Sequence, residues 1–366
     1  MVSHSVRRIL APLLFPVSLI YGFVTSIRNS FFNLGILKST EFGFPVISVG
    51  NITVGGTGKT PHTEYLLRLL GEKYPVAYLS RGYKRKTKGY ILASESSSPD
   101  EIGDEAFQIS NKFSGIRIAV DENRVHGIQM LKEKFRDLKC VILDDAYQHR
   151  YIQAGVSVLL IDYNRPMHKD YLLPAGDLRE KRSGIHRANI VIITKVPDSI
   201  KPIEKRIWIK ELSLYPYQFL YFTTLKYGPL TSVYEKKKKP EIRDLKIYPV
   251  LMVTGIANPA PLYEKLKATY HRVDRLCFAD HHKYTHSDAE NIHARFKAIQ
   301  APDKLIITTE KDAVKLRDIS SSEDVLKENL YYLPVEVKFL FDQGTEFDEN
   351  ILEYVGKNKR ISRLHC

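Results

Sequence analysis

The sequence has little cysteine and no closely spaced cysteine pair. Its 366 residues include three cysteines, Cys140, Cys277 and Cys366, which are odd in number and far apart along the chain. Disulfide-held domains carry paired cysteines, and thiolate zinc sites need pairs of the CxxC type. The sequence therefore predicts neither a disulfide framework nor a thiolate zinc site, and it is typical of a reducing compartment.

The sequence also lacks the compositional bias that marks disordered, collagenous or coiled-coil chains. Hydrophobic residues make up 43% of it, aromatic residues 11% and charged residues 27%, with 20 glycines and 18 prolines. These values are those of an ordinary globular protein. Because a domain usually takes roughly 100 to 200 residues, the length predicts two lobes and an appendage, and we find no internal repeat.

Acidic residues are too few to balance the basic ones. The chain has 55 Lys and Arg against 42 Asp and Glu, which leaves a formal net charge of +13. Such a surface attracts polyanions, which include nucleic acid, anionic lipid and phosphorylated substrates. The net charge does not choose among these three classes.

The longest uncharged apolar stretch lies near the N-terminus, at residues 9–25 (ILAPLLFPVSLIYGFVT). Three arginines flank it: Arg7, Arg8 and Arg28. Its length is at the lower limit for a spanning helix, Pro12 and Pro16 weaken its middle, and no small-residue cleavage site follows it. We expect a membrane anchor that lies in or dips into an anionic leaflet. The alternative is a helix packed on the core of the protein itself.

After this segment, short apolar runs alternate with helical patterns, which predicts βαβ units. Strands are expected at residues 45–49, 76–79, 116–120, 140–143, 156–161, 190–194, 250–254 and 305–308. The predicted fold class is therefore α/β: a P-loop NTPase-like lobe with a mainly parallel sheet flanked by helices, a second, smaller α/β lobe, and the N-terminal membrane-associated helix.

The residue pattern changes at residues 205–235, where aromatic and β-branched residues alternate. This pattern predicts an antiparallel hairpin or bridge between the lobes. We therefore expect an N-terminal anchoring helix at 1–40, a phosphate-loop lobe at 41–204, an aromatic-rich hairpin or linker at 205–247 and a C-terminal α/β lobe at 248–366.

The strongest single pattern is the glycine-rich NITVGGTGKT at residues 51–60, between an apolar strand and a helical pattern. Backbone amides of such a loop point at one phosphate chain, and the positive end of the following helix adds to their field. The expected nucleotide-binding residues are Thr53, Val54, Gly55, Gly56, Thr57, Gly58, Lys59 and Thr60. Lys59 should reach the β- and γ-phosphates, and the Thr60 hydroxyl should hold Mg²⁺.

The loop departs from G-x-x-x-x-G-K-[ST] at Thr53, where the first glycine would stand. The alternative is that Gly-Lys-Thr occurs here by chance and binds no phosphate. The strand before it, the helix after it and Pro61 in a tolerated first-turn position favour a true phosphate loop.

A second acidic site follows the apolar strand that ends in Asp144 and Asp145. Phosphate-loop enzymes place a metal-organising acid at the end of a neighbouring strand. We therefore expect Asp144 or Asp145 to hold Mg²⁺, against the alternative of a polar strand end before a turn. Strand alternation sends the two side chains to opposite faces, and the sequence does not decide which one faces the ion.

A GTPase would add D-x-x-G and [NT]-K-x-D elements to its phosphate loop. Tyr147 and Gln148 stand where the first would need glycine, and in residues 194–198 (TKVPD) the acid comes one residue late. Motifs of motors or helicases are not found. A small-molecule or lipid kinase is favoured, and a GTPase or a nucleotide-dependent module that binds a polyanionic partner stays the alternative.

Seven short motifs together resemble those of the tetraacyldisaccharide 4'-kinase family. They are VGNITVGGTGKT (49–60), SRGYKRK (80–86), GDEA (103–106), LDDAYQHR (143–150), LLPAGDLRE (172–180), FADHH (278–282) and TTEKDAVKL (308–316). The resemblance covers roughly residues 1–320 in the same order. It departs at Ala146-Tyr147, where the family favours Gly-Phe, and at the doubled His281-His282.

The resemblance implies a membrane-associated lipid A biosynthesis enzyme of Gram-negative bacteria. Such an enzyme transfers the γ-phosphate of ATP, with Mg²⁺, to the 4'-hydroxyl of a tetraacyldisaccharide 1-phosphate. It would work at the cytoplasmic face of the inner membrane, anchored through the N-terminal helix. We also expect a monomer and no nucleic-acid partner.

The resemblance also implies the catalytic residues. Asp104 would be the base that takes the proton of the sugar hydroxyl, and His281 would form a dyad with it, while Lys59 binds phosphate. The dyad would draw one member from each lobe, which predicts an active site in a cleft that closes on both substrates. The alternative for Asp104 is a helix cap, and Glu105 fits either the Mg²⁺ shell or a first-turn acid.

Residues that follow the strands are candidates for holding the acceptor, whose 1-phosphate is anionic. They are Arg81, Lys84, Arg85, Gln148, His149 and Arg179. A solvated charged face is the alternative for the basic run at 81–88, and a surface ion pair is the alternative for Arg179-Glu180.

Overall fold

The computed structural model describes residues 4–234, 245–319 and 324–357. The chain forms two compact units. The larger unit comprises residues 1–225 and 337–366, and the smaller unit comprises residues 226–336.

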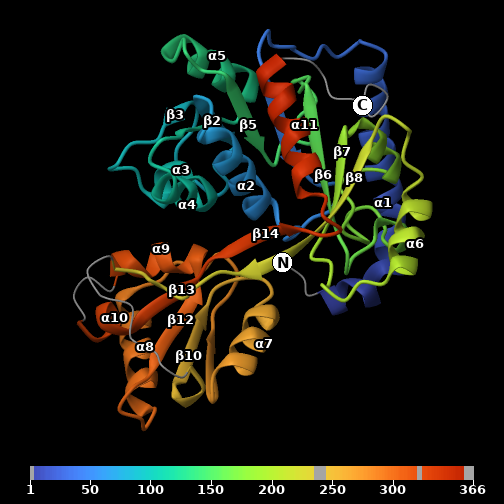
Figure 1. The fold of residues 1–366 in the computed structure, drawn as a ribbon. Helices are drawn as coiled ribbons and strands as arrows, with labels where there is room; N and C mark the ends of the chain where they lie inside the picture. The colour runs from blue at the N-terminus through green and yellow to red at the C-terminus, as the bar shows by residue number, and fades with distance from the viewer. Residues whose placement is uncertain (1–3, 235–244, 320–323, 358–366) are drawn as a thin grey trace. The chain divides into compact units, whose positions relative to one another are not determined.

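The larger unit is built on a mainly parallel sheet (Figure 1). Its strands are β1 (Val46–Gly50), β2 (Val76–Ser80), β3 (Ile91–Leu92), β4 (Arg117–Val120), β5 (Cys140–Asp144), β6 (Val156–Asp162), β7 (Ile190–Thr194), β8 (Phe219–Tyr227) and β14 (Val335–Phe339). They lie in the order β14-β8-β7-β6-β1-β5-β2-β4-β3. The strands β1, β2, β5 and β7 are buried along their whole length, as expected for parallel strands covered on both faces.

Helices cover both faces of this sheet. They are α1 (His4–Asn33), α2 (Lys59–Gly71), α3 (Pro99–Ile102), α4 (Asp104–Lys112), α5 (Arg124–Lys134), α6 (Pro202–Leu212) and α11 (Gly344–Lys357), with the 3-10 turns η1 (Met167–Lys169) and η2 (Arg182–Arg187). Leu67 of α2 and Ile351 of α11 share one hydrophobic core, whereas Trp208 of α6 belongs to a second core. The α/β fold class is confirmed.

The smaller unit has its own sheet, in the order β11-β10-β12-β13-β9. Its strands are β9 (Thr231–Ser232), β10 (Pro249–Thr254), β11 (Arg272–Cys277), β12 (Leu305–Thr309) and β13 (Leu330–Leu333). Its helices are η3 (Leu245–Ile247), α7 (Ala260–Thr269), α8 (His286–Ala298), α9 (Glu310–Ile319) and α10 (Asp324–Asn329). From β10 the chain goes first to β11 on one side and then to β12 on the other. This reversal makes a topological switch point at the carboxyl ends of β10 and β12, the usual place for functional side chains in open α/β sheets.

The predicted strands are confirmed, each to within one residue at either end. Each predicted strand is a short, continuous apolar run, which is the pattern expected of a parallel strand that is buried on both faces. The predicted hairpin at 205–235 is wrong. Residues 202–212 form α6, and β8 is a single strand parallel to β7, with Phe219 opposite Ile190.

The reason lies in signals that outweigh the aromatic alternation. Pro202 stands in the first turn of α6, and the Glu204 carboxylate accepts the backbone N–H of Lys201 at 2.8 Å. Trp208 and Leu212, four residues apart, give the helix its buried face. Of the proposed 205–247 linker, residues 235–244 lie outside the described residues.

The predicted C-terminal lobe at 248–366 is also wrong at its end. The chain returns to the larger unit from Val337 onward. Phe347 and Ile351 of α11 enter that unit's core, and the Tyr354 hydroxyl accepts the Val46 N–H at 3.0 Å. The apolar stripe of α11 therefore completes the β1 side of the first sheet rather than the second lobe.

Helix α1 is longer than the predicted 9–25 segment and packs along one side. The Tyr21 hydroxyl donates to the Arg179 carbonyl at 2.8 Å, and Ser18 Oγ accepts the Ala175 N–H at 2.9 Å. The opposite side leaves Ile20 and Phe23 65% and 66% exposed. Among the described residues, no helix is both long enough and apolar enough to span a bilayer. Packing on the protein is thus observed for one side, and membrane anchoring stays a prediction.

Candidate phosphate-transfer site

The glycine-rich loop joins β1 to α2, as predicted. Gly55 and Gly58 have φ values of 96° and 85°, a region that favours glycine, and Gly58 directly precedes α2. Thr53 forms an isolated bridge with Leu178, and the Val54 N–H donates to the Asp177 carbonyl at 2.8 Å. This extended conformation suits threonine, so the departure from the glycine pattern has a structural reason.

Lys59 lies at the start of α2, and its ammonium faces acceptors from two other segments. Its Nζ is 3.6 Å from Asp145 Oδ1 and 3.5 Å from Asn51 Oδ1. Asn51 also donates from Nδ2 to Thr57 Oγ1 at 2.8 Å, which fixes the far side of the loop. Sequence reasoning assigned Asn51 no role, although its position directly after an apolar strand was a usable signal. Thr60 follows Lys59 in the first turn of α2.

Two cations hold the outside of the loop. Lys195 donates to the Gly56 carbonyl and lies 2.7 Å from Asp162 Oδ2, while Arg165 donates to the Val54 carbonyl at 3.1 Å. Lys195 belongs to the TKVPD segment that nearly matches a guanine-reading motif. Its side chain instead supports the phosphate loop.

Asp144 is the buried member of the acid pair. It ends β5, and its carboxylate accepts the Tyr78 hydroxyl at 2.9 Å and the Thr63 hydroxyl at 3.4 Å. Burial, reinforced by the charge of Asp145, raises the pKa of Asp144 to about 6, although Lys59 and Tyr78 oppose this. Burial makes the ionised form of this carboxylate unfavourable, and a cation bound nearby would stabilise that form.

Asp145 differs from its neighbour in its backbone conformation and its charged partners. It has a φ of 47°, which turns it out of the strand, and it pairs with Arg179 at 3.0 Å as well as with Lys59. Burial opposes its ionisation, but Lys59 and Arg179 outweigh burial and hold the pKa of Asp145 below its ordinary value. The two acids therefore have separate environments, and the cause is the turn at Asp145, which lies beyond the end of β5.

Arg179 and Glu180 do not pair with each other. Arg179 also donates to Gln148 Oε1 at 3.3 Å, and Glu180 pairs with Arg187 at 2.7 Å. Gln148 Nε2 donates to the Asn51 carbonyl at 2.7 Å. The surface ion pair considered as an alternative is therefore not formed, and the structure brings Gln148 and Arg179 to the phosphate loop.

His149 and Arg124 lie in the same electropositive surroundings. Burial, followed by the charges of Arg124, Arg28 and Arg81, lowers the pKa of His149 to about 4. Arg124 is 5% exposed and interacts electrostatically with Arg81, Asp145 and Asp144. Arg124 lies at the start of α5 and belongs to no motif, so the sequence did not predict its place at the site.

The basic run after β2 divides into different environments. Arg81 is exposed beside the site, and Lys84 lies 5.8 Å from the Tyr83 ring. Arg85 has a side chain that is only 2% exposed, and it pairs with Glu122 at 2.8 Å. Arg85 is therefore neutralised by Glu122. Arg81 instead belongs to the group of cations around Asp144 and Asp145, because it interacts electrostatically with Arg124.

Asp104 is the first residue of α4, and the cap position belongs to Gly103. Gly103 has a φ of 86°, and a Cβ there would lie 2.9 Å from the Tyr83 carbonyl oxygen, so the turn requires glycine. The cap alternative for Asp104 is thus wrong as stated. Glu105 follows it and interacts electrostatically with Asp144 and Tyr78, which brings its charge to the acid pair.

The two adjacent histidines of the smaller unit have different surroundings. His282 stacks on the Phe278 ring at 4.6 Å between centroids, and its Nε2 lies 3.0 Å from Asp288 Oδ2. His281 instead has Lys311 Nζ at 3.1 Å from its Nδ1. His282 thus contacts the Phe278 ring and the Asp288 carboxylate, whereas His281 lies beside the Lys311 ammonium.

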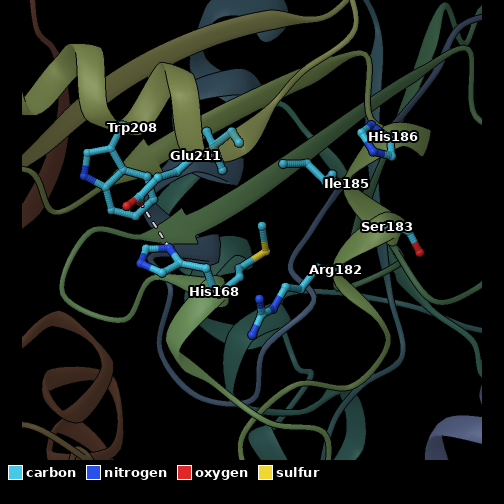
Figure 2. Close-up of a pocket in the computed structure, with 9 residues that line it drawn as sticks. His168, Arg182, Ser183, Ile185, His186, Trp208 and Glu211 are labelled. Atoms are coloured by element: carbon cyan, nitrogen blue, oxygen red, sulfur yellow. Dashed lines mark ion pairs between the residues drawn. The ribbon is translucent and has the colours of Figure 1, made fainter.

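A cavity of about 250 Å³ lies elsewhere in the larger unit, between η1, η2 and α6. Figure 2 shows the paired His168 and Glu211 side chains in its lining, with Trp208 and Arg182 nearby. His168 Nδ1 and Glu211 Oε2 are 3.2 Å apart. The residues that line this cavity do not include the phosphate loop.

The oxygen ligands that Mg²⁺ prefers are present at the loop in the Thr60 hydroxyl and the carboxylates of Asp144 and Asp145. Across the described part of the chain, no cluster of three or more His, Cys, Asp or Glu has metal-ligand spacing. The donor set at the loop suits an ion shared with a phosphate chain, because Mg²⁺ is usually held by one or two carboxylates together with substrate phosphates.

The fold and the loop define a P-loop nucleotide-binding protein. A sequence model described as tetraacyldisaccharide-1-P 4'-kinase matches residues 10–356. The chain belongs to this family.

Named relatives agree over nearly the whole length. The tetraacyldisaccharide 4'-kinase of Bacteroides thetaiotaomicron is 48% identical over 95% of this chain and 94% of its own. That of Phocaeicola vulgatus is 49% identical over 96% and 97%. A crystal structure of LpxK from Aquifex aeolicus in complex with ATP matches with a TM-score of 0.74 and 28% identity, over 94% of this chain and 99% of that one.

Proposed function

We propose that this protein is an ATP-dependent kinase that phosphorylates the 4'-hydroxyl of a tetraacyldisaccharide 1-phosphate in lipid A biosynthesis. The observation that carries the proposal is the pairing of Lys59 with Asp145 beside a glycine-rich loop, in a member of this family. The ATP complex of the Aquifex structure supports ATP as the phosphate donor.

The phosphate loop would bind the triphosphate through its backbone amides, and Lys59 would follow the β- and γ-phosphates. Thr60 with Asp144 or Asp145 would hold Mg²⁺, with Glu105 as a further acid. The ion, when bound, neutralises charge on the phosphate oxygens as the γ-phosphoryl group leaves. The raised pKa of Asp144 supports this assignment, because a nearby cation would stabilise its ionised form.

Asp104 would accept the proton of the sugar hydroxyl, and His281 would be its dyad partner. A helix N-terminus stabilises a carboxylate, so the first-turn position of Asp104 supports an ionised base. The stacking of His282 and its bond to Asp288 leave His281 as the better candidate of the two histidines.

Arg81, His149, Gln148 and Arg179 would bind the phosphorylated acceptor. Their support is the shared electropositive region beside Asp145. Lys84 stays a candidate on the same loop, and the buried pairing of Arg85 with Glu122 favours a loop-holding role for Arg85.

Helix α1 would anchor the protein to the cytoplasmic face of the bacterial inner membrane. The exposed residues on its outer side support this, because Leu13, Ile20, Phe23 and Val24 are 76%, 65%, 66% and 59% exposed. A monomer stays a prediction, and light scattering of the purified protein should then give the mass of one chain, 42.1 kDa.

The proposal is tested by incubating the purified full-length protein with γ-labelled ATP, Mg²⁺ and the tetraacyldisaccharide 1-phosphate, followed by thin-layer separation. Label should appear in the lipid, and excess unlabelled ATP should compete better than GTP. Active protein that labels another acceptor but not this lipid would rule the proposal out, and preferential competition by GTP would support a GTPase.

A further inference from the structure

Asp162 is the last residue of β6 and lies opposite the last residue of β7. Its side chain is 5% exposed, and its two carboxylate oxygens have different partners. Oδ1 accepts the Asn164 N–H at 3.0 Å, which holds the turn that follows β6. Oδ2 lies 2.7 Å from Lys195 Nζ and 3.5 Å from Arg165 Nη2. One buried acid therefore fixes the positions of two cations.

Side chains at the carboxyl ends of β6 and β7 donate hydrogen bonds to three carbonyl groups of the phosphate loop. The pairs are Arg165 with Val54 at 3.1 Å, Lys195 with Gly56, and Thr194 with Thr57 at 2.9 Å. Arg165 also lies directly against the loop, because a Cβ at Gly55 would be 2.9 Å from its Nη1. The acid at the end of β6 is thus connected to the loop through both of its cations.

These bonds also orient amide groups of the loop. In a trans peptide, the carbonyl of one residue and the N–H of the next point in opposite directions. Because the Val54 and Thr57 carbonyls face the donor side chains, the N–H groups of Gly55 and Gly58 point to the opposite side. The Thr57 N–H donates to the Gly55 carbonyl at 3.0 Å. Two loop amides are therefore turned away from the cations, where a phosphate chain can accept their hydrogen bonds.

The backbone of Lys195 has an uncommon conformation. Its φ is 57°, a value that few residues other than glycine adopt. The Val196 N–H that follows donates to the Thr223 carbonyl at 3.0 Å, which holds the turn on its other side. Such conformations persist where the surroundings fix them, and they are common at functional sites. The turn brings the Lys195 side chain from the end of β7 to the phosphate loop.

We propose that Asp162 is a positioning residue for the phosphate loop. Through Lys195 and Arg165 it holds the loop carbonyls on one side, so that the loop amides are oriented for a triphosphate before ATP binds. This inference rests on the proposed function, in which the loop binds ATP. Because the Lys195 ammonium already bonds the loop and Asp162, it acts on the phosphate chain through the loop and does not read the base.

Asp162→Asn removes the charge that holds the two cations, while its amide oxygen can still accept the Asn164 N–H. In the purified full-length protein, the KM for ATP should rise by about tenfold to a hundredfold, the loss expected when charge-assisted hydrogen bonds are removed. The kcat should stay within about threefold of wild type, because contacts shared by substrate and transition state act on KM. The KM for the acceptor lipid should also stay within about threefold.

Glu64→Gln is the matched control. Glu64 also has a buried carboxylate, with a side chain that is 4% exposed, and it pairs with the Lys112 ammonium at 2.6 Å. Its partners Lys112 and Gln108 belong to α4 rather than to the phosphate loop. This variant should lower the melting temperature about as much as Asp162→Asn, whereas its KM for ATP should stay at the wild-type value. An equal rise of that KM in both variants would indicate lost stability and overturn the proposal.

Variants of Lys195 test whether Asp162 acts through this cation. Lys195→Met should also raise the KM for ATP, and the double variant with Asp162→Asn should lose little more than the weaker single variant, because the two residues act as a unit. Lys195→Arg keeps the charge and the donors, so it should restore most of the affinity. Fully additive losses in the double variant would contradict an action of Asp162 through Lys195.

Isothermal titration calorimetry gives a readout that does not depend on transfer. Asp162→Asn should bind ATP and inorganic tripolyphosphate more weakly than wild type by a similar factor, because the loop contacts the phosphate chain. Unchanged affinity for both, together with an unchanged KM, overturns the proposal. A loss for ATP alone overturns it too, because the effect would then lie at the base. If wild-type protein labels no lipid, the proposed function fails, whereas the two titrations still report whether Asp162 orients the loop.

Discussion

The acids after β5 illustrate how neighbouring residues of one type acquire different chemistry. Asp144 is buried beneath two hydroxyl donors with its pKa raised to about 6, whereas Asp145 turns outward to two cations that lower its pKa. Paired titratable groups whose environments separate their pKa values are typical of functional sites. The pattern of residue types predicted the pair, and only the fold separated its members.

Removal of the proposed base should stop the reaction without unfolding the protein. Asp104→Ala should lower kcat by about 10² to 10⁴, the usual contribution of a general base. Lys59→Ala should cause a loss of several orders of magnitude, because phosphoryl transfer depends on charge placement. The melting temperature of each variant, measured beside its turnover, checks the fold. Near-normal turnover in Asp104→Ala would remove that residue from the role of base.

His62 should make stability depend on pH. Burial lowers its pKa from 6.5 to about 4, and its Nε2 lies 3.0 Å from the Thr223 hydroxyl. Below pH 6.5 the unfolded chain binds a proton that the folded protein does not, so the free energy of unfolding should fall as pH drops toward 4. The loss should be about 2–3 kcal/mol.

Denaturant titrations at several pH values measure this slope. His62→Gln should lose that part of the slope, and His271→Gln, at an exposed position, serves as the control that keeps it. Equal slopes in wild type and His62→Gln would contradict the assignment.

Several residues at the site carried too weak a signal to be found from sequence. Asn51 and Lys195 follow strands but match no phosphate-binding pattern, and Arg124 reaches the acids from the start of α5. Their roles depend on which strand ends lie side by side. Local sequence does not specify that order, whereas Lys59, Thr60 and Asp144 lie in motifs whose spacing does.

At the scale of elements, continuous buried strands were predictable and the aromatic segment was not. The period-two pattern across residues 205–235 indicated a hairpin, but α6 and β8 divide the segment between a helix and a parallel strand. Aromatic residues fit a half-buried strand and the buried face of a helix equally well. The capping contact between Lys201 and Glu204 favours the helix. Residue propensities alone do not include this contact, so they favoured the strand.

The exposed side of α1 should bind lipid. Ile20→Glu with Val24→Glu places two charges four residues apart on that side, which would cost the burial of apolar surface in a bilayer. Co-sedimentation with anionic vesicles should fall several-fold while ATP binding stays near wild type. Ser30→Glu, an exposed polar position on the same helix, is the control. Undiminished vesicle binding by the double variant would contradict an anchoring role.

Removal of residues 1–28 should act in the same direction. The truncated protein loses the Tyr21 contact as well as the exposed apolar side. Membrane recovery and the use of bilayer-embedded substrate should fall more than ATP binding, which equilibrium binding of a labelled nucleotide measures. A truncated protein that stays fully with the membrane fraction would place the anchor elsewhere.

For the whole molecule, the net charge of +13 should make membrane association depend on salt and on lipid charge. Binding to vesicles with anionic lipid should exceed binding to neutral vesicles, and it should weaken several-fold between about 0.05 M and about 0.5 M NaCl. Flotation assays at stepped salt concentrations measure this. If vesicle binding depends on neither salt concentration nor lipid charge, membrane association would be due to apolar insertion alone.

The path of the whole chain was the least predictable feature. The larger unit takes back the C-terminal segment, so Phe347 and Ile351 complete a core whose other members lie near the start of the sequence. An amphipathic helix shows that it needs a partner surface but not which one. The order of motifs therefore predicted two lobes, and it placed the end of the chain in the wrong one.

The most direct test of the account is a crystal structure of the full-length protein with Mg²⁺, a non-hydrolysable ATP analogue and the acceptor lipid. The account predicts that the Asp104 carboxylate and the His281 ring lie within hydrogen-bond distance of each other, beside the 4'-hydroxyl and a γ-phosphate bound by Lys59. A complex that is competent for transfer but holds these two side chains far apart would contradict it.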